Sequence, residues 1–177
     1  MKTPIELALA EKIAADTDIS GHLHYLRFLA SGCKTVVEFG VRYCCSTIAF
    51  AAGLADAGGG TLYSYDHKSP LASWPKPEGV KWVFRQEDTG NMPLIPECDL
   101  LFIDTLHTYA HVKKELLHAS QARIVAFHDT ALFGFVDEGG GTGPGIVLAV
   151  EEFMSDNPEW KLTDKFQHNN GLWVIRR

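Results

Sequence analysis

The sequence predicts an α/β protein whose mostly parallel, Rossmann-like sheet carries helices on both faces. Two observations predict this fold. Short, unbroken apolar runs alternate with helical segments along the chain, and a hairpin turn signal joins the last two runs. Unbroken apolar strands between helices are typical of a parallel sheet that is buried on both faces. The final hairpin adds an antiparallel strand at the C-terminal end of the chain.

Two amphipathic helical segments begin the chain. The first spans residues 5–15, with apolar residues at helical spacing. The second starts at Ile19 or Ser20, and Gly32 closes it, as glycine commonly does at a helix C-terminus. These N-terminal helices, within residues 1–32, could cover a binding site or form the interface of a homodimer.

Strands and helices then alternate. The expected strands are Thr35–Phe39, Thr61–Tyr65, Val80–Phe84, Asp99–Ile103, Arg123–Phe127, Leu162–Phe166 and Leu172–Ile175, with Asn169-Asn170-Gly171 as the hairpin turn. The expected helices are Thr47–Ala57, Tyr109–Ala119 and Ile146–Met154. The proline-rich connector Pro70–Pro77 predicts no helix. We therefore expect one domain that spans residues 1–177.

Composition narrows the classes of function. A chain of 177 residues with 46% hydrophobic and 21% charged residues is long enough to bury a core. The net charge of −6 and the scattered basic residues argue against a nucleic-acid partner, because phosphate contacts need a basic face. No apolar run has transmembrane length and no signal-peptide core is present, so we expect no membrane partner and a cytoplasmic location. The four cysteines show no CxxC spacing and predict free thiols.

The first strand ends in a turn with polar residues. Glu38 and Gly40 end the run, and Ser46 and Thr47 open the next helix, where their hydroxyls could cap it and their amides offer an anion site. Gly40 permits a tight turn and a close approach of a ligand. The segment does not match GxGxxG, which argues against a dinucleotide.

Acidic residues follow the second and third strands. Asp66 could accept hydrogen bonds from both ribose hydroxyls of a nucleotide, or could make a local turn. Asp88 could bind an adenine amino group, or could be a surface acid. Because ligands in such sheets bind beyond the carboxyl ends of the strands, these positions are the first to consider.

The fourth and fifth strands end in carboxylates and imidazoles. Asp104 follows the fourth strand, and His128 and Asp129 follow the fifth. Two carboxylates and an imidazole at one sheet edge can hold a divalent cation. Alternatively, His128 bonds a buried carbonyl and Asp129 caps a loop. The glycine-rich segment 138–145 comes next, and it could be a mobile lid or a plain flexible loop.

Taken together, these segments resemble class I S-adenosylmethionine-dependent methyltransferases. The likeness rests on Val-Val-Glu-Phe-Gly-Val-Arg at 36–42, Ser46-Thr47, Phe102-Ile103-Asp104-x-x-His107-x-Tyr109 and Phe127-His128-Asp129. It runs from about Val36 to the end of the chain. It is nearest to a small subgroup that resembles catechol O-methyltransferase and the cephalosporin-hydroxylase-like proteins. The Asp-x-x-His-x-Tyr and His-Asp segments together are the specific part.

The resemblance implies a seven-stranded sheet and an enzyme that transfers a methyl group from S-adenosylmethionine to a hydroxyl or sugar of a small molecule. It places the cofactor on Glu38, Gly40, Ser46, Asp66 and Asp88. It implies that magnesium or another divalent metal lies on Asp104, His128 and Asp129. His107 stands three residues after Asp104, where relatives carry their general base, so the resemblance implies a catalytic role for His107 beside Asp104.

The chain departs from the relatives at two places. Relatives usually have glycine where this chain has Cys44 and often a small residue at Cys45, so a side chain there could crowd the methionine end of the cofactor. Relatives tend to have an acid where this chain has His128, and imidazole suits softer metals than magnesium. These departures support an alternative, a non-catalytic protein that binds S-adenosylmethionine or S-adenosylhomocysteine.

The sequence defines the acceptor subsite less clearly than it defines the cofactor and metal positions. Trp74, Phe133 and Phe135 could line it, and each could equally pack in the core or in a loop. A nicotinamide-dependent oxidoreductase is a second alternative, which the missing GxGxxG motif disfavours.

Overall fold

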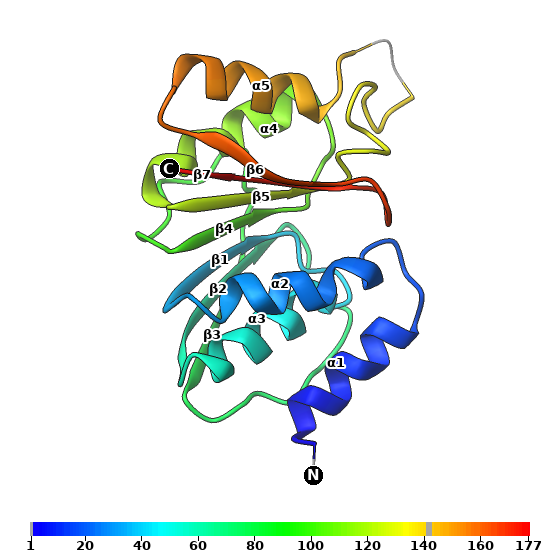
Figure 1. The fold of residues 1–177 in the computed structure, drawn as a ribbon, viewed down its shortest axis with the longest axis vertical. Helices are drawn as coiled ribbons and strands as arrows, with labels where there is room; N and C mark the ends of the chain where they lie inside the picture. Colours follow the sequence, from blue (N-terminus) through cyan, green and yellow to red (C-terminus); the bar gives the residue numbers. More distant parts are fainter. Residues whose placement is uncertain (1, 141–142) are drawn as a thin grey trace.

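The computed structural model describes residues 2–140 and 143–177, and seven strands within these ranges form one sheet (Figure 1). The strands are β1 (Thr35–Phe39), β2 (Gly60–Asp66), β3 (Val80–Gln86), β4 (Leu100–Ile103), β5 (Ile124–His128), β6 (Lys161–Phe166) and β7 (Leu172–Arg176). Their order is β3-β2-β1-β4-β5-β7-β6. Among these seven strands, β7 runs in the direction opposite to the other six. The predicted sheet with its C-terminal antiparallel hairpin is confirmed.

Helices cover both faces of this sheet. They are α1 (Pro4–Ala14), η1 (Ser20–His22), α2 (Leu23–Ala30), α3 (Cys45–Asp56), α4 (Tyr109–Glu115), η2 (Leu116–Gln121) and α5 (Ile146–Asp156), with η marking 3₁₀ helices. Figure 1 shows α1, α2 and α3 together on one side and α4 and α5 on the other. The helix expected over 109–119 is α-helical only to Glu115 and continues as η2.

Successive strand residues point to opposite faces, and this alternation divides the core in two. Val36, Leu100 and Phe102 pack with α1, α2 and α3, whereas Val37 and Leu101 pack with α4 and α5. All five are fully buried. Burial on both faces explains why the strands read as unbroken apolar runs in the sequence.

The order of the sheet determines where a ligand can bind. The chain builds β1, β2 and β3 outward in one direction and β4 and β5 outward in the other, so the switch point lies between β1 and β4. Ligands of open α/β sheets bind in the crevice beyond the carboxyl ends of the strands at this point. The ends of β1 and β4 are therefore the centre of the candidate site.

The structure also bears on the cysteines and on the length of the helices. All four cysteines are free thiols, as predicted, and Cys45 is the one among them that is half-buried rather than buried. Across residues 2–140 and 143–177, none of the helices has both the length and the apolar character that crossing a bilayer requires.

Candidate functional site

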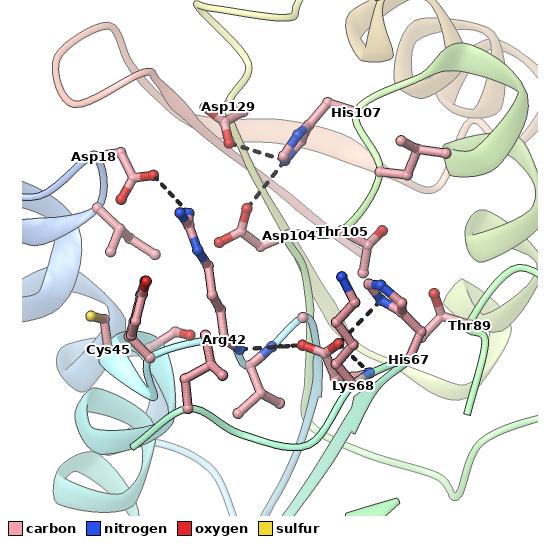
Figure 2. A pocket seen from close by; sticks show the side chains of 18 of the residues that line it. Asp18, Arg42, Cys45, His67, Lys68, Thr89, Asp104, Thr105, His107 and Asp129 are labelled. Atoms are coloured by element: carbon pink, nitrogen blue, oxygen red, sulfur yellow. Dashed lines mark hydrogen bonds and ion pairs between the residues drawn. The ribbon is translucent and has the colours of Figure 1, made fainter. Parts of the chain in front are cut away.

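A cavity of about 1190 Å³ opens at the carboxyl ends of the strands (Figure 2). Loops that follow β1 to β5 line it, and so does the N-terminal segment between α1 and η1. Seven of the predicted site residues are on its wall, namely Gly40, Ser46, Asp66, Asp88, Asp104, His107 and Asp129. The remaining two, Glu38 and His128, lie behind the wall with their side chains buried.

The turn after β1 depends on Gly40. Its φ of +88° is unfavourable for residues with a side chain, and a Cβ there would overlap the main-chain oxygen of Asp104. Asp66, at the end of β2, holds the other side of this turn. Its Oδ2 accepts hydrogen bonds from the amides of Val41 at 2.9 Å and Arg42 at 3.2 Å, and its Oδ1 accepts one from Lys68 at 3.0 Å. Asp66 thus shapes the turn as well as facing the cavity.

Glu38 supports the turn from beneath. Its carboxylate is fully buried and accepts hydrogen bonds from the hydroxyls of Ser46 at 2.6 Å, Thr47 at 2.9 Å and Ser64 at 2.6 Å. Burial raises the pKa of Glu38 to about 7, and these hydroxyls oppose the rise. Neither Ser46 nor Thr47 caps α3, contrary to expectation, because both hydroxyls donate to Glu38. Glu38 therefore ties β1, β2 and the start of α3 together.

We expect Glu38→Gln to flatten the pH dependence of stability between about pH 4.5 and pH 7. In this interval the native state keeps a proton that the unfolded chain has released, so the free energy of unfolding falls as pH rises. The full change amounts to roughly 3 kcal/mol. Glutamine keeps the shape and cannot ionise. Urea unfolding of both proteins at pH 5, 6, 7 and 8 measures the difference, and parallel curves would contradict the assignment.

Cys44 does not crowd the cavity, which corrects the expectation drawn from its unusual side chain. It has a φ of +59°, the left-handed conformation that favours glycine. Its side chain is buried on the far side of the turn, with Sγ 3.4 Å from the main-chain oxygen of Ala72. The neighbouring Cys45 does reach the cavity wall. Of the two cysteines, Cys45 rather than Cys44 therefore faces the cavity.

Four side chains meet where β4 and β5 end. Nε2 of His107 lies 3.2 Å from Oδ1 of Asp104 and 3.0 Å from Oδ2 of Asp129. Nδ1 of His128 lies 3.3 Å from the same Asp104 oxygen and 3.2 Å from the same Asp129 oxygen. Figure 2 shows Asp104 and Asp129 directed toward His107. The structure therefore brings the predicted catalytic and metal-ligating residues into one cluster.

The charges in this cluster reinforce one another. Burial would raise the pKa of Asp104, but His128 and His107 lower it to about 2, and the pKa of Asp129 is lowered in the same way. Burial would lower the pKa of both imidazoles, but the two carboxylates raise it to about 10 for His107 and about 11 for His128. Protons on the imidazoles and a divalent cation would compete for the same carboxylates.

The residues present fit a divalent cation. One ligand atom each from Asp104, His128 and Asp129 lies within 4.8 Å of the others. Nε2 of His128 donates to the main-chain oxygen of Asn169 at 3.0 Å, which leaves Nδ1 for the cation. Oδ1 of Asp129 is buried without a hydrogen-bond partner, and a cation would satisfy it. Two carboxylates and one imidazole suit ions such as Mn²⁺.

The tip of the β6–β7 hairpin holds this cluster in place. Asn169 and Asn170 have φ of +44° and +64°, and Gly171 follows at +90°. The main-chain oxygen of Asn169 accepts hydrogen bonds from His128 and, at 3.2 Å, from Nε2 of His22 near the N-terminus. The chain's second helical segment and its last hairpin thus meet behind the site.

The glycine-rich segment is attached to His107 through Glu138. Oε2 of Glu138 accepts hydrogen bonds from Nδ1 of His107 at 2.8 Å and from its amide at 3.0 Å. The ring of Phe133 stacks on the imidazole, with centroids 5.2 Å apart. The expectation of a lid covers 138–145, of which Gly141 and Thr142 lie outside the described residues. Of the predicted acceptor-side aromatics, Phe133 lines the cavity, Trp74 is buried against Trp82, and Phe135 is exposed.

Sequence reasoning missed several groups on the cavity wall. Asp18, from the N-terminal segment, faces Arg42, with 3.8 Å between Oδ2 and Nη1, and Figure 2 shows the Arg42 side chain ending beside Asp18. On the other side, Thr89 and Thr105 line the cavity and bond the buried Glu115. The one sequence signal for Glu115 is its position among the apolar residues of the helix face that packs on the sheet. Asp88 is exposed, and its carboxylate accepts hydrogen bonds from the amide of Gly90 and the side chain of Asn91.

Known structures share this architecture. An O-methyltransferase from Bacillus cereus in complex with SAH is 17% identical, covers 100% of this chain and 92% of its own, and has a TM-score of 0.61. TomG of Streptomyces achromogenes, an O-methyltransferase in complex with SAM, is 18% identical over 89% and 79% of the two chains, with a TM-score of 0.62. The methyltransferase PaMTH1 of Podospora anserina, bound to SAH, is 15% identical over 99% and 88%, with a TM-score of 0.57. No curated protein sequence matches.

The fold and the residues at its strand ends define a Rossmann-like methyltransferase fold, as the resemblance implied. The family model described as a methyltransferase domain matches residues 37–130, more than half of the chain. The chain belongs to this methyltransferase domain family. The matched region begins within β1 and ends directly after Asp129, so it contains every predicted site residue.

Proposed function

We propose that the protein is an S-adenosylmethionine-dependent O-methyltransferase that acts on a hydroxyl of a small molecule. The observation that carries this proposal is the cluster of Asp104, His107 and Asp129, which stands on the same cavity wall as the Gly40 turn. A methyl acceptor and its donor can therefore meet in one cavity. Relatives in the same fold support the proposal, since TomG is an O-methyltransferase in complex with SAM.

The cofactor would lie along the ends of β1, β2 and β3. Gly40 and Ser46 would face its methionine part, and Asp66 would accept hydrogen bonds from its ribose hydroxyls. Oδ2 of Asp66 already accepts two amides of the turn, whereas Oδ1 accepts one and keeps a lone pair, so Oδ1 is the oxygen that would face the ribose. The sulfonium methyl would then point toward the ends of β4 and β5, where Asp104 and His107 line the cavity.

A divalent cation would lie on Asp104, His128 and Asp129. When bound, it would lower the pKa of an acceptor hydroxyl. Asn169 holds His128 in the tautomer that such a site needs. Magnesium suits the carboxylates, and the imidazole shifts the preference toward manganese or a later metal.

His107 is the general base of the proposed reaction in its neutral form. Asp104 and Asp129 otherwise keep Nε2 protonated, and a cation bound to these carboxylates would offset their charge and lower the pKa of His107. Glu138 and Phe133 orient its ring so that Nε2 faces the cavity side of Asp104 and Asp129. The acceptor hydroxyl gives its proton to Nε2, and its oxygen attacks the methyl carbon in line with the breaking carbon–sulfur bond. S-adenosylhomocysteine leaves with the electron pair of that bond. The N-terminal wall near Asp18 and Arg42 remains for the rest of the acceptor.

Calorimetry distinguishes this proposal from its two alternatives. Titration of the protein with S-adenosylhomocysteine, S-adenosylmethionine and NAD should show binding of the first two. Binding of NAD alone would replace the proposal with a nicotinamide-dependent protein. Binding of S-adenosylmethionine without turnover of any hydroxylated small molecule or sugar, with Mn²⁺ or Mg²⁺ present, would favour the non-catalytic alternative.

We expect Asp104→Asn to remove the metal site. Loss of a ligand should weaken the binding of Mn²⁺ by at least about 100-fold, because even residues that only support a ligand contribute about 10–100-fold to affinity. Metal analysis after dialysis and Mn²⁺ calorimetry measure the change. Asp156→Asn, an exposed aspartate on α5, is the matched control. Equal metal content in both variants would place the site elsewhere.

A further inference from the structure

Glu115 is a buried carboxylate that the proposed reaction does not use. It ends α4 and has no exposed surface. Its Oε1 accepts hydrogen bonds from the hydroxyl of Thr89 at 2.5 Å and from that of Thr105 at 2.7 Å, and Nε2 of His111 lies 3.2 Å away. Thr89, Thr105 and His111 all line the cavity. Glu115 thus organises one end of the cavity from behind its wall.

The direction of these hydrogen bonds has a chemical consequence. A hydroxyl has one proton to donate, and a carboxylate oxygen in this arrangement can only accept. Both threonine protons therefore point toward Glu115. The oxygen of Thr89 can also accept from Nε2 of His111 at 3.4 Å, so a ligand meets the remaining lone pairs of Thr89 and Thr105. This end of the cavity accepts hydrogen bonds, and a ligand group that fits it must donate them.

The location of Thr89 and Thr105 in the cavity indicates which part of the cofactor they would contact. Figure 2 shows Thr89 and Thr105 on the side of the cavity away from Asp18. With the methyl group near His107 and the ribose at Asp66, the base falls at the end of β3, where Thr89 lies. Asp88, the residue expected to read the base, has both carboxylate oxygens bonded to its own loop, to Gly90 and Asn91.

We propose that Glu115 is a positioning residue that makes the site select a 6-amino purine over a 6-oxo purine. This inference rests on the proposed function and adds a determinant of base specificity. The exocyclic amine of adenine donates to the lone pairs of Thr89 and Thr105. The oxygen of a 6-oxo purine would face those lone pairs without a proton between them, which leaves buried polar groups unpaired.

The test compares two ligands that differ only at this position, S-adenosylhomocysteine and its 6-oxo counterpart, S-inosylhomocysteine. We expect the native protein to bind the first at least about tenfold more tightly, as an unpaired buried polar group implies. In Glu115→Gln the side-chain amide donates to a threonine oxygen and turns its proton toward the ligand. The ratio of the two affinities should then fall several-fold, whereas a merely structural loss would weaken both ligands equally.

Glu97→Gln, the same change at an exposed glutamate, is the control and should keep the native ratio. If circular dichroism shows that Glu115→Gln does not fold, Thr105→Val tests the inference instead. This variant removes one of the two hydroxyl oxygens that would accept a hydrogen bond from the ligand, and it keeps the Glu115 carboxylate. An unchanged ratio in the folded variants overturns the inference. Equal binding of both ligands by the native protein overturns it too, yet leaves the proposed function standing. Binding of neither ligand overturns the proposed function and the inference with it.

Discussion

Gly40→Ala should abolish the binding of S-adenosylhomocysteine and lower the free energy of unfolding by about 3 kcal/mol or more. Two independent costs add at this position. The φ of +88° is unfavourable for alanine, and the new Cβ would overlap the main-chain oxygen of Asp104. No side-chain rotation relieves an overlap with main chain. The turn after β1 must therefore move away from Asp104, and with it the wall that would hold the cofactor.

Gly58→Ala separates these two costs. Gly58 has a φ of +78°, and a Cβ there would have no atom within 4 Å. This variant carries the conformational cost alone, about 1–3 kcal/mol, and should bind the cofactor normally. Urea unfolding and calorimetry on both variants measure the two effects. If Gly40→Ala loses no more stability than Gly58→Ala and still binds, the contact between the turn and Asp104 does not shape the site.

His107→Gln should reduce the turnover of a methyl acceptor by about 10²–10⁴-fold, the range that general bases typically contribute. Glutamine retains a hydrogen bond to the carboxylates and cannot take the acceptor's proton. The affinity for S-adenosylhomocysteine should stay within about twofold of the native value, since His107 faces the acceptor rather than the ribose. Single-turnover rates and calorimetry on the same preparations separate chemistry from binding.

His24→Gln, an exposed histidine on α2, makes the same chemical change away from the cavity and should leave both quantities unaltered. The turnover of Glu138→Gln should lie between those of His107→Gln and His24→Gln. This change weakens the hydrogen bond that orients the His107 ring through Nδ1, and it keeps the base. Native turnover in His107→Gln would show that another group takes the proton. His128 would then be the next candidate, and the metal assignment would change with it.

The sheet and the meeting of Asp104 with Asp129 could both be predicted from the positions of the apolar runs. Apolar runs located the strands, and parallel strands bring their carboxyl ends to one edge, so Asp104 and Asp129 had to approach each other. The side-chain direction of Cys44 was not predictable, because it depends on a left-handed φ that sequence reasoning assigns to glycine. Glu115 escaped notice for a related reason: its partners Thr89 and Thr105 lie 26 and 10 residues away.

The tip of the β6–β7 hairpin determines when, during synthesis, the cluster around His128 can form. His128 takes its orientation from the carbonyl of Asn169, and His22 bonds the same atom. A ribosome delivers His22 first and Asn169 only 147 residues later. The sheet can gather β1 to β5 during synthesis, as domains often begin to do. The ends of β4 and β5 cannot reach their final arrangement until the β6–β7 hairpin has left the exit tunnel. A nascent chain can therefore form the Gly40 turn before it completes the cluster around His107 and His128.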